Sequence, residues 1–222
     1  MGTALVVAMD GPSGAGKSST SRGVAARLSL AYLDTGAMYR AMTWALLQAG
    51  VDVSDPDAIA AAAEDVRLVS GTDPAAPAIE ANGIDVAGPI RSAKVTAAVS
   101  AVSAVPRVRE ILVELQRSII ASANGIVVEG RDIGSTVVPD SPVKIYLVAD
   151  VEARAARRTA ELGGSATAVS TTKADLARRD HKDSTRASSP LARAEDAIVI
   201  DSTFLTLEEV IDKVVALVAA AS

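Results

Sequence analysis

The 222-residue sequence has no cysteine, a single histidine and only 2% aromatic residues. Without cysteine, the protein cannot use thiol nucleophiles, disulfides or cysteine-ligated zinc. With one histidine it has no histidine pair for a metal site, and a Ser-His-Asp hydrolase would depend on His181 alone. Catalysis, if there is any, must therefore rely mainly on carboxylates, arginine, lysine, hydroxyls and backbone groups.

Long hydrophobic runs are also missing, since no apolar run approaches the ~18–20 residues needed to cross a bilayer. Residues 1–4 carry no basic segment of the kind that opens a secretory leader. Together with the lack of cysteine, these features predict a soluble cytoplasmic protein with no membrane partner. The apolar fraction of 49% is ample for a packed core, and the length suits one α/β domain with at most a small insertion.

Excess positive charge is absent too. The net charge is −5, which argues against nucleic acid as a partner, because binding to its backbone calls for a basic surface. Arginine is nevertheless abundant, with sixteen arginines against six lysines. A GC-rich genome would produce the same bias, so the positions of the arginines have to decide whether they carry function.

Short apolar runs alternate with helical stretches along the chain, as in a parallel sheet covered by helices. The runs are residues 4–9, 31–33, 126–128, 143–148 and 197–200. The first run leads into a glycine-rich turn and a helix over residues 17–28. We therefore expect an α/β fold with a five-stranded, parallel, doubly wound sheet. The last helix should begin after Thr206, with Glu209 as its capping-box partner and Leu205 and Val210 at the staple positions.

The alternation breaks between about residues 66 and 90, where turn signals flank short apolar stretches. The dipeptide Asn82-Gly83 between Ile79 and Ile84 predicts a β-hairpin. We expect a small antiparallel insertion at this point.

Helical patterns follow over about residues 92–123, with an interruption near Pro106. Farther along, Gly163-Gly164-Ser165 separates two arginine-rich helical stretches, residues 151–162 and about 173–186. We expect these two stretches to form a helical lid.

The sequence GPSGAGKS at residues 11–18 matches the phosphate-binding pattern G-x-x-x-x-G-K-[ST] and lies between an expected strand and an expected helix. Glycines let backbone N–H groups turn toward a polyphosphate, and the helix N-terminus adds positive partial charge. Lys17 would reach the β and γ phosphates, and Ser18 would supply a hydroxyl ligand to Mg²⁺. The pattern predicts a nucleoside triphosphate site.

A GTPase is one alternative for this loop, because residues 85–88 (DVAG) match D-x-x-G and residues 172–175 (TKAD) resemble a guanine-reading motif. Thr35 would then be the switch threonine. The positions count against this class: the first pattern falls in the expected hairpin, and residues 165–171 before the second are small and polar rather than a buried strand.

Three polar segments follow expected strands or the lid and should meet at one sheet edge. They are DTGAMYR at residues 34–40, EGRD at 129–132 and RDHKDSTR at 179–186. Arginine binds phosphate oxygens in bidentate fashion, whereas carboxylates accept from sugar hydroxyls or an exocyclic amine. These segments predict a site for a phosphorylated acceptor, with exposed ion pairs at Arg131-Asp132 and Arg179-Asp180 as the alternative interpretation.

His181 lies between Asp180 and Lys182 on a polar helix, so we expect it at the solvated surface. Phosphoryl transfer to a phosphate acceptor needs no strong base. Trp44 is expected in the core, and Tyr39 near the acceptor.

At these residues the chain resembles the bacterial cytidylate kinases, nucleoside monophosphate kinases with a phosphate-binding loop that phosphorylate CMP and dCMP with ATP and Mg²⁺. The matching segments keep the family's order over nearly the whole chain: residues 10–18, 33–40, 106–110, 129–134, 142–145, 178–186 and 189–202. The resemblance implies a phosphate-loop kinase fold acting as a monomer. It also implies a core of residues 1–34, 124–150 and 187–222, a nucleoside monophosphate-binding domain of residues 35–123, and a lid of residues 151–186.

The resemblance further implies roles for single residues. The ATP phosphates would be held by Gly11, Pro12, Ser13, Gly14, Ala15, Gly16, Lys17, Ser18 and Ser19. The acceptor phosphate would be gripped by Arg40, Arg131 and Arg186. Cytosine would be read by Ser100, Arg109 and Asp132. The sugar and its phosphate would be surrounded by Thr35, Tyr39, Arg179 and Asp183. The lid would contribute Arg154, Arg157 and Arg158.

Catalysis is then expected from Lys17, Arg131, Arg157, Arg158 and Arg186. The chain departs from the family at Thr35, where some members have serine, and at residues 181–182 and 184–185, which leaves the contacts of that segment open. The carboxylate beside the Mg²⁺ also stays open among Asp10, Asp34 and Asp132.

Overall fold

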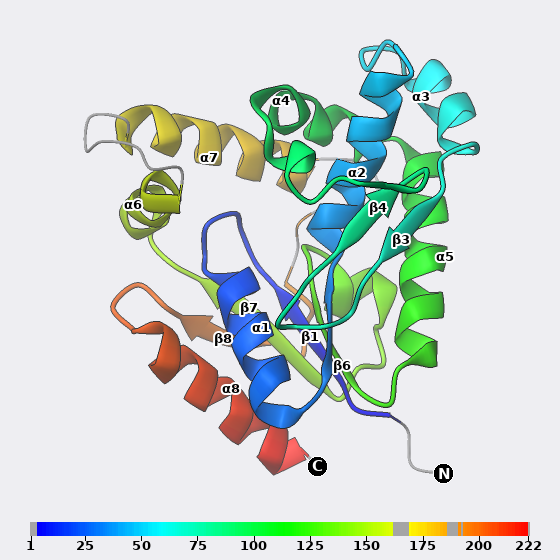
Figure 1. Ribbon diagram of the computed structural model, residues 1–222. Helices are drawn as coiled ribbons and strands as arrows, with labels where there is room; N and C mark the ends of the chain where they lie inside the picture. Colours follow the sequence, from blue (N-terminus) through cyan, green and yellow to red (C-terminus); the bar gives the residue numbers. More distant parts are fainter. Residues whose placement is uncertain (1–3, 162–168, 186–190, 192, 222) are drawn as a thin grey trace.

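The computed structural model describes residues 4–161, 169–185, 191 and 193–221. Its centre is a five-stranded parallel sheet with the strand order β2-β6-β1-β7-β8 (Figure 1). The strands are β1 Val6–Asp10, β2 Ala31–Asp34, β6 Ile126–Glu129, β7 Val143–Val148 and β8 Ile198–Asp201. Each expected strand overlaps an observed one, so the predicted parallel sheet is confirmed.

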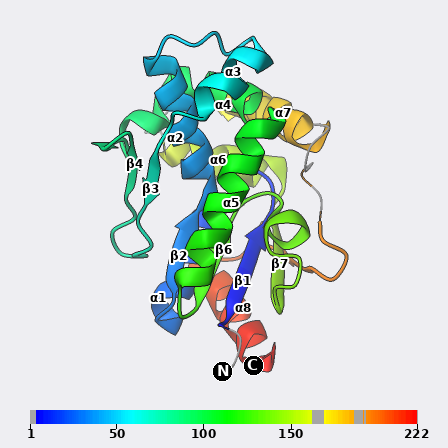
Figure 2. The same cartoon turned by 90° about the vertical axis from the view of Figure 1, so that its right-hand side faces the viewer.

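Helices cover both faces of this sheet, and a separate hydrophobic cluster lies under each face. Val7 and Met9 of β1 pack in one cluster with α1 (Lys17–Leu28) and α8 (Leu207–Ala221), whereas Ala8 packs in the other. The second cluster includes α2 (Thr35–Gln48) and α5 (Pro106–Ser122), and Figure 2 shows α5 lying across the sheet. Because successive strand residues point to opposite faces, strands buried on both sides read as continuous apolar runs.

A small antiparallel sheet contains β3 (Leu68–Ser70), β4 (Ile79–Ala81) and β5 (Ile84–Asp85). Asn82 and Gly83 join β4 to β5 with φ angles of 52° and 77°. Two consecutive residues with positive φ make the tight hairpin turn that Asn-Gly favours. The predicted hairpin is confirmed, while β3 and helix α3 (Pro56–Ala63), which begins at the Asp55 cap, were not expected from the sequence.

The antiparallel sheet packs beside α2 and is joined to the parallel sheet through the loop between β3 and β4 (Figure 1). The backbone N–H of Tyr32 in β2 donates to the Thr72 carbonyl at 2.8 Å, and Arg22 Nε of α1 donates to the Pro74 carbonyl at 2.8 Å. A one-turn helix η1 (Pro89–Arg91) then leads to α4 (Ala93–Val102), and the expected interruption before Pro106 separates α4 from α5. The insertion is therefore fastened at the edge strand β2 and helix α1.

Helices α6 (Val151–Glu161) and α7 (Val169–Thr185) pack against each other beside the first loop of the chain (Figure 1). The two predicted helices are present, with α7 beginning earlier than expected. The glycine pair at residues 163–164 lies outside the described residues. Residues 172–175 lie inside α7 and residues 85–88 begin in β5, so neither follows a buried parallel strand as a guanine-nucleotide motif would.

No helix in the described part of the chain is long and apolar enough to cross a membrane. The longest helices, α5 and α7, have 17 residues each. Both carry charged residues along their length.

Helix α8 begins with the predicted capping box. The N–H of Thr206 donates to the Glu209 carboxylate at 2.8 Å, and the N–H of Glu209 donates to Thr206 Oγ1 at 3.3 Å. Val210 is buried and Leu205 packs against the same cluster, as a hydrophobic staple requires. The reciprocal bonds satisfy two N–H groups that the helix itself cannot pair.

We expect Thr206→Ala to lower the free energy of unfolding by about 1 kcal/mol, because it leaves the first turn of α8 without its side-chain acceptor. Urea denaturation followed by circular dichroism measures the change. Ser122→Ala is the control: it removes an exposed hydroxyl that bonds only within the end of α5, and should stay within about 0.5 kcal/mol. Equal free energies of unfolding for the two variants would show that the Thr206 cap does not stabilise α8.

Candidate active site

The phosphate-binding loop joins β1 to α1 at the carboxyl end of the sheet. Three of its glycines have positive φ: Gly11 at 142°, Gly14 at 80° and Gly16 at 94°. A Cβ on Gly11 would lie 2.0 Å from the carbonyl oxygen of Leu147 in β7, and Gly16 is the N-cap of α1. The loop can therefore follow this path only with glycine at these positions, and it directs the N-terminus of α1 toward the open end of the sheet.

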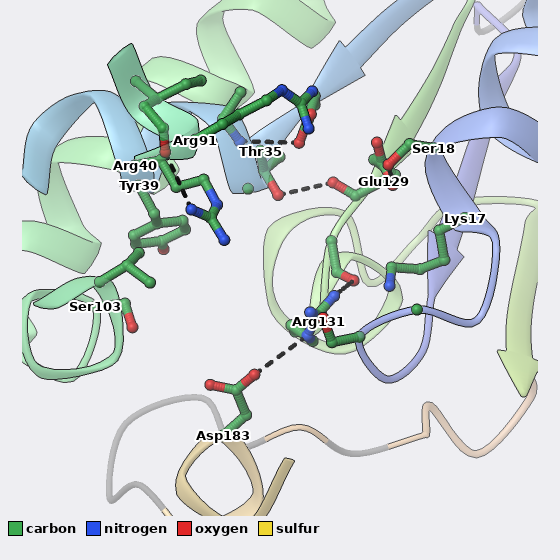
Figure 3. Close-up of a pocket in the computed structure, with 18 of the residues that line it drawn as sticks. Lys17, Ser18, Thr35, Tyr39, Arg40, Arg91, Ser103, Glu129, Arg131 and Asp183 are labelled. Atoms are coloured by element: carbon green, nitrogen blue, oxygen red, sulfur yellow. Dashed lines mark hydrogen bonds and ion pairs between the residues drawn. The ribbon is translucent and has the colours of Figure 1, made fainter. Parts of the chain in front are cut away.

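A cavity of about 360 Å³ opens beside the loop (Figure 3). Its wall is built from the loop and from the starts or ends of α1, α2, α4, α5, β6, α6 and α7. Lys17 and Ser18 lie at one side, Arg40 and Tyr39 at the other, and Arg131 between them. The carboxyl ends of parallel strands are where ligands of such sheets bind.

Lys17 lies at the bottom of the loop, with its ammonium group donating to the Pro12 carbonyl at 2.8 Å. Only 6% of the residue is exposed. Burial and the neighbouring Arg131 guanidinium lower the pKa of Lys17, because both disfavour its charged form. A bound polyphosphate would reverse this effect, since its negative charge favours the ammonium ion.

Glu129 lies opposite the loop, at the end of β6. Ser18 Oγ donates to Glu129 Oε2 at 3.1 Å, and the Tyr32 hydroxyl donates to Oε1. Thr35 Oγ1 donates to the Glu129 backbone carbonyl at 2.7 Å (Figure 3). Burial and the nearby Asp34 raise the pKa of the Glu129 carboxyl. The residue thus brings a buried carboxylate to the hydroxyl of the loop.

The other acidic residues near the loop have different surroundings. Asp10 accepts from the N–H groups of Ile133 and Gly134, both at 2.8 Å, and burial raises its pKa to about 6. It anchors the short helix η2 (Ile133–Val137). Asp34 caps α2 by accepting from the Ala37 N–H at 2.9 Å, and it lines the cavity.

Asp132 forms a buried ion pair with Arg109 of α5 in the cavity wall. These two residues are 4% and 3% exposed. The Arg109 guanidinium also lies 5.3 Å from the centroid of the Tyr39 ring, within the range of a cation–π contact. Among the described residues, Arg109 Nε is buried without a hydrogen-bond partner. This corner of the cavity wall therefore holds a buried carboxylate and guanidinium beside the ring of Tyr39.

Two arginines carry positive charge into the middle of the cavity. Arg131 Nε donates to Asp183 at 3.3 Å, which joins the end of β6 to α7 (Figure 3). Arg40 of α2 donates to the Ile90 carbonyl and to Thr96 Oγ1, both at 3.0 Å. Both residues line the same cavity, Arg40 at one side and Arg131 near its middle.

The lid arginines differ from one another in their contacts. Arg154 pairs with Asp180 and donates to the Ser13 carbonyl at 3.0 Å, while the Ser13 N–H donates to Asp180 at 3.3 Å. Arg157 donates to Ser202 Oγ at 3.0 Å and to the Ser202 carbonyl at 2.6 Å. Arg154 thus attaches α6 to the phosphate-binding loop and Arg157 attaches α6 to Ser202, whereas Arg158 lines the cavity.

The model for the family described as cytidylate kinase matches residues 7–220 of the chain. The chain belongs to the cytidylate kinase family. The cytidylate kinase of Streptomyces avermitilis is 59% identical over 216 residues, covering 97% of this chain and 93% of its own. That of Nocardia farcinica is 55% identical over 219 residues, with 98% and 94% covered, and that of Mycolicibacterium paratuberculosis is 50% identical over 214 residues, with 96% and 94% covered.

Most of the residues that the resemblance to cytidylate kinases assigned to substrates do line the one cavity. They are Ser13, Gly14, Gly16, Lys17, Ser18, Ser19, Thr35, Tyr39, Arg40, Ser100, Arg109, Arg131, Asp132, Arg158 and Asp183. Gly11, Pro12 and Ala15 belong to the loop but not to the cavity wall. Arg186 and the side chain of Arg179 lie outside the described residues. The exposed His181 is not in the wall, and Trp44 packs against the core, as expected.

The cavity wall also contains charged or hydroxyl-bearing residues to which the sequence assigned no individual role: Arg22, Arg91, Ser103 and Glu129. Glu129 had a detectable signal, because it stands at the end of an apolar run directly before Arg131 and Asp132. Arg22 lies one helical turn after Ser18, so its place at the cavity also followed from helical spacing. Arg91 and Ser103 carry no comparable local signal.

Oxygen donors at the loop suit Mg²⁺. Ser18 supplies a hydroxyl, with the Glu129 and Asp34 carboxylates beside it. The described residues contain no cluster of three or more His, Asp or Glu side chains that could hold a metal ion by itself. Mg²⁺ commonly binds through substrate phosphates, waters and one or two protein oxygens, and the side chains at the loop match that donor set.

We expect Gly11→Ala to weaken ATP binding at least tenfold, because its Cβ would displace the loop from the Leu147 carbonyl. Isothermal titration calorimetry with ATP measures the change, and thermal unfolding monitors the fold. Gly88→Ala is the matched control, since a Cβ at Gly88 meets no atom within 4 Å. A Gly11→Ala protein with unchanged ATP affinity would show that the loop does not require glycine there.

Proposed function

We propose that this protein transfers the γ-phosphoryl group of ATP to CMP or dCMP, giving ADP and CDP or dCDP. The observation that carries the proposal is one cavity whose wall holds the phosphate-binding loop, the Arg40 and Arg131 guanidinium groups and the buried Arg109–Asp132 pair. Membership in the cytidylate kinase family supports the same reaction.

Catalysis would come from alignment and fixed charge. The transferring phosphoryl group carries negative charge on its equatorial oxygens, so cations held in place before reaction stabilise it. Lys17, Arg131 and Arg158 line the cavity where that charge would develop. Holding donor and acceptor in line also removes much of the entropic barrier of a two-substrate reaction.

The acceptor phosphate would bind Arg40, Arg131 and Arg186. Arg131 already pairs with a carboxylate, that of Asp183, so an incoming phosphate would replace one anionic partner by another. Asp183 would then be available to a sugar hydroxyl. We assign Thr35, Tyr39, Arg179 and Asp183 to this part of the acceptor.

The base would be read by Ser100, Arg109 and Asp132. A carboxylate accepts a hydrogen bond from the exocyclic amine of cytosine, whereas uracil presents a carbonyl oxygen at that position. The Arg109 guanidinium, which lies beside Asp132 in the same wall, would donate to a ring acceptor of the base. Both groups are buried, so a base that failed to pair with them would leave unsatisfied polar groups.

The lid would close over the transferring group with Arg154, Arg157 and Arg158. Closure keeps water away from the γ-phosphoryl group. We propose that the lid spans residues 151–186, the acceptor domain residues 35–123, and the core the remaining residues. We also expect the protein to act as a monomer in the cytoplasm.

Mg²⁺ would bind at Ser18, with Glu129 and Asp34 accepting hydrogen bonds from its waters. When bound, it neutralises phosphate charge and orients the donor. The hydroxyl of Ser18 and the two neighbouring carboxylates are the contributions of the chain to this site.

We expect Lys17→Ala to reduce kcat by about 10²–10³-fold or more, because it removes a fixed positive charge from the donor phosphates. A coupled ADP assay measures the rate. The variant should keep its fold, since burial already disfavours the Lys17 charge. Lys213→Ala, on the exposed side of α8, is the control with unchanged activity. A folded Lys17→Ala protein with substantial activity would refute the role of Lys17.

Comparison of CMP, dCMP, UMP and AMP as acceptors tests the substrate class. We expect kcat/KM for CMP to exceed that for UMP by roughly ten- to a hundredfold, since losing a hydrogen bond to a charged group costs ~1.5–3 kcal/mol. A preference for UMP or AMP would contradict cytidylate specificity and indicate a nucleoside monophosphate kinase with a different acceptor. Failure of every acceptor, with tight GTP binding and slow hydrolysis, would instead favour the GTPase class.

A further inference from the structure

Tyr32 has a buried hydroxyl at the active site, although its ring belongs to the hydrophobic core. The ring packs with residues of α1 in the cluster under one face of the sheet, and the residue is 2% exposed. Tyr32 does not line the cavity. Its hydroxyl donates to Glu129 Oε1, so a core residue outside the cavity wall bonds a carboxylate within that wall.

Strand register explains why these two side chains meet. In the parallel pair of β2 and β6, Tyr32 is opposite Val127 and Asp34 is opposite Glu129. Tyr32, Val127 and Glu129 therefore point to the same face, the one covered by α1. The length of the tyrosine ring spans the two-residue offset. On the edge of β2 away from β6, the Tyr32 N–H donates to the Thr72 carbonyl. This bond holds the edge strand in place at Tyr32.

The two oxygens of Glu129 have separate donors. Oε1 accepts from Tyr32, and Oε2 accepts from Ser18 at 3.1 Å. Because each oxygen is engaged, the carboxylate plane cannot turn without breaking one of the bonds. Ser18 has a single hydroxyl proton, and donating it to Glu129 leaves the lone pairs of Ser18 Oγ directed elsewhere.

We propose that Tyr32 is a positioning residue for the magnesium end of the site. Its hydroxyl holds Glu129 in the orientation that accepts the Ser18 proton, which would leave a lone pair of Ser18 Oγ to coordinate the cation. Groups that orient a metal ligand in this way affect metal affinity without touching the metal. The inference rests on the proposed ATP-dependent function, because it concerns the cation that accompanies ATP.

Tyr32→Phe tests the inference, since it removes the hydroxyl and keeps the ring that packs in the core. Calorimetric titration with a non-hydrolysable ATP analogue is performed twice, in Mg²⁺ and in EDTA. We define the Mg²⁺ gain as the affinity for the analogue in Mg²⁺ divided by its affinity in EDTA. We expect Tyr32→Phe to leave the affinity in EDTA unchanged and to reduce the Mg²⁺ gain by up to about tenfold. In assays, the Mg²⁺ concentration for half-maximal rate should rise, while KM for CMP stays the same.

Ser141→Ala is the control, because it deletes a buried hydroxyl that bonds the Val6 and Val143 carbonyls at the other end of the sheet, away from the cavity wall, and it should leave both titrations unchanged. Glu129→Gln should reduce the Mg²⁺ gain in the same direction as Tyr32→Phe. If Tyr32 acts through Glu129, the double variant should be no worse than Glu129→Gln alone.

Three results would overturn the inference: an unchanged Mg²⁺ gain in Tyr32→Phe, equal losses in Mg²⁺ and in EDTA, or additive losses in the double variant. A Tyr32→Phe protein that does not fold would likewise assign the hydroxyl to stability alone. Failure of the proposed function has a different signature, because the wild-type protein would then bind no ATP analogue in either titration.

Discussion

Burial of charge at the carboxyl end of the parallel sheet is the constraint on which the site depends. Removing a charged group from water is costly unless a partner compensates it. Here the partners come from distant segments: Arg109 of α5 pairs with Asp132 after β6, and Glu129 of β6 accepts from Ser18 of α1 and Tyr32 of β2. These contacts therefore hold α1, α5, β2 and β6 together around the cavity before any substrate enters. The charged side chains then need little reorganisation when a substrate binds.

The same compensation determines what a ligand must offer. Arg131 is held by Asp183, and Asp132 by Arg109, so an entering molecule competes with existing ion pairs. A phosphate can take the place of a carboxylate on arginine and keep the charge-assisted bonds, whereas a neutral acceptor bonds arginine more weakly. Under the proposed function, a base that pairs with both Arg109 and Asp132 would recover the cost of disturbing their ion pair. Selectivity would then arise from the penalty on wrong ligands as much as from attraction to the right one.

The lid and the phosphate-binding loop are also joined. Arg154 of α6 and Asp180 of α7 both bond to the backbone of Ser13, and Arg157 connects α6 to Ser202 beside the loop. A Cβ at Gly14 would lie 3.2 Å from the Cβ of Arg154, so the small residue serves lid packing as well as the turn. A movement of α6 must therefore change contacts at the phosphate-binding loop.

The sequence predicted features that depend on neighbouring residues. The strands, the Asn82-Gly83 hairpin, the cap of α8 and the phosphate-binding loop each have a local pattern with a physical cause. Strand β3 was missed because three residues, two of them not buried, give too little periodicity, and α3 because its alanine-rich sequence lacks an apolar stripe. The bond between Tyr32 and Glu129 joins residues 97 positions apart, and it exists only because β2 pairs with β6 in one register. A shift by one residue would turn Tyr32 to the other face of the sheet, so a bond of this kind becomes visible only when the pairing of strands is known.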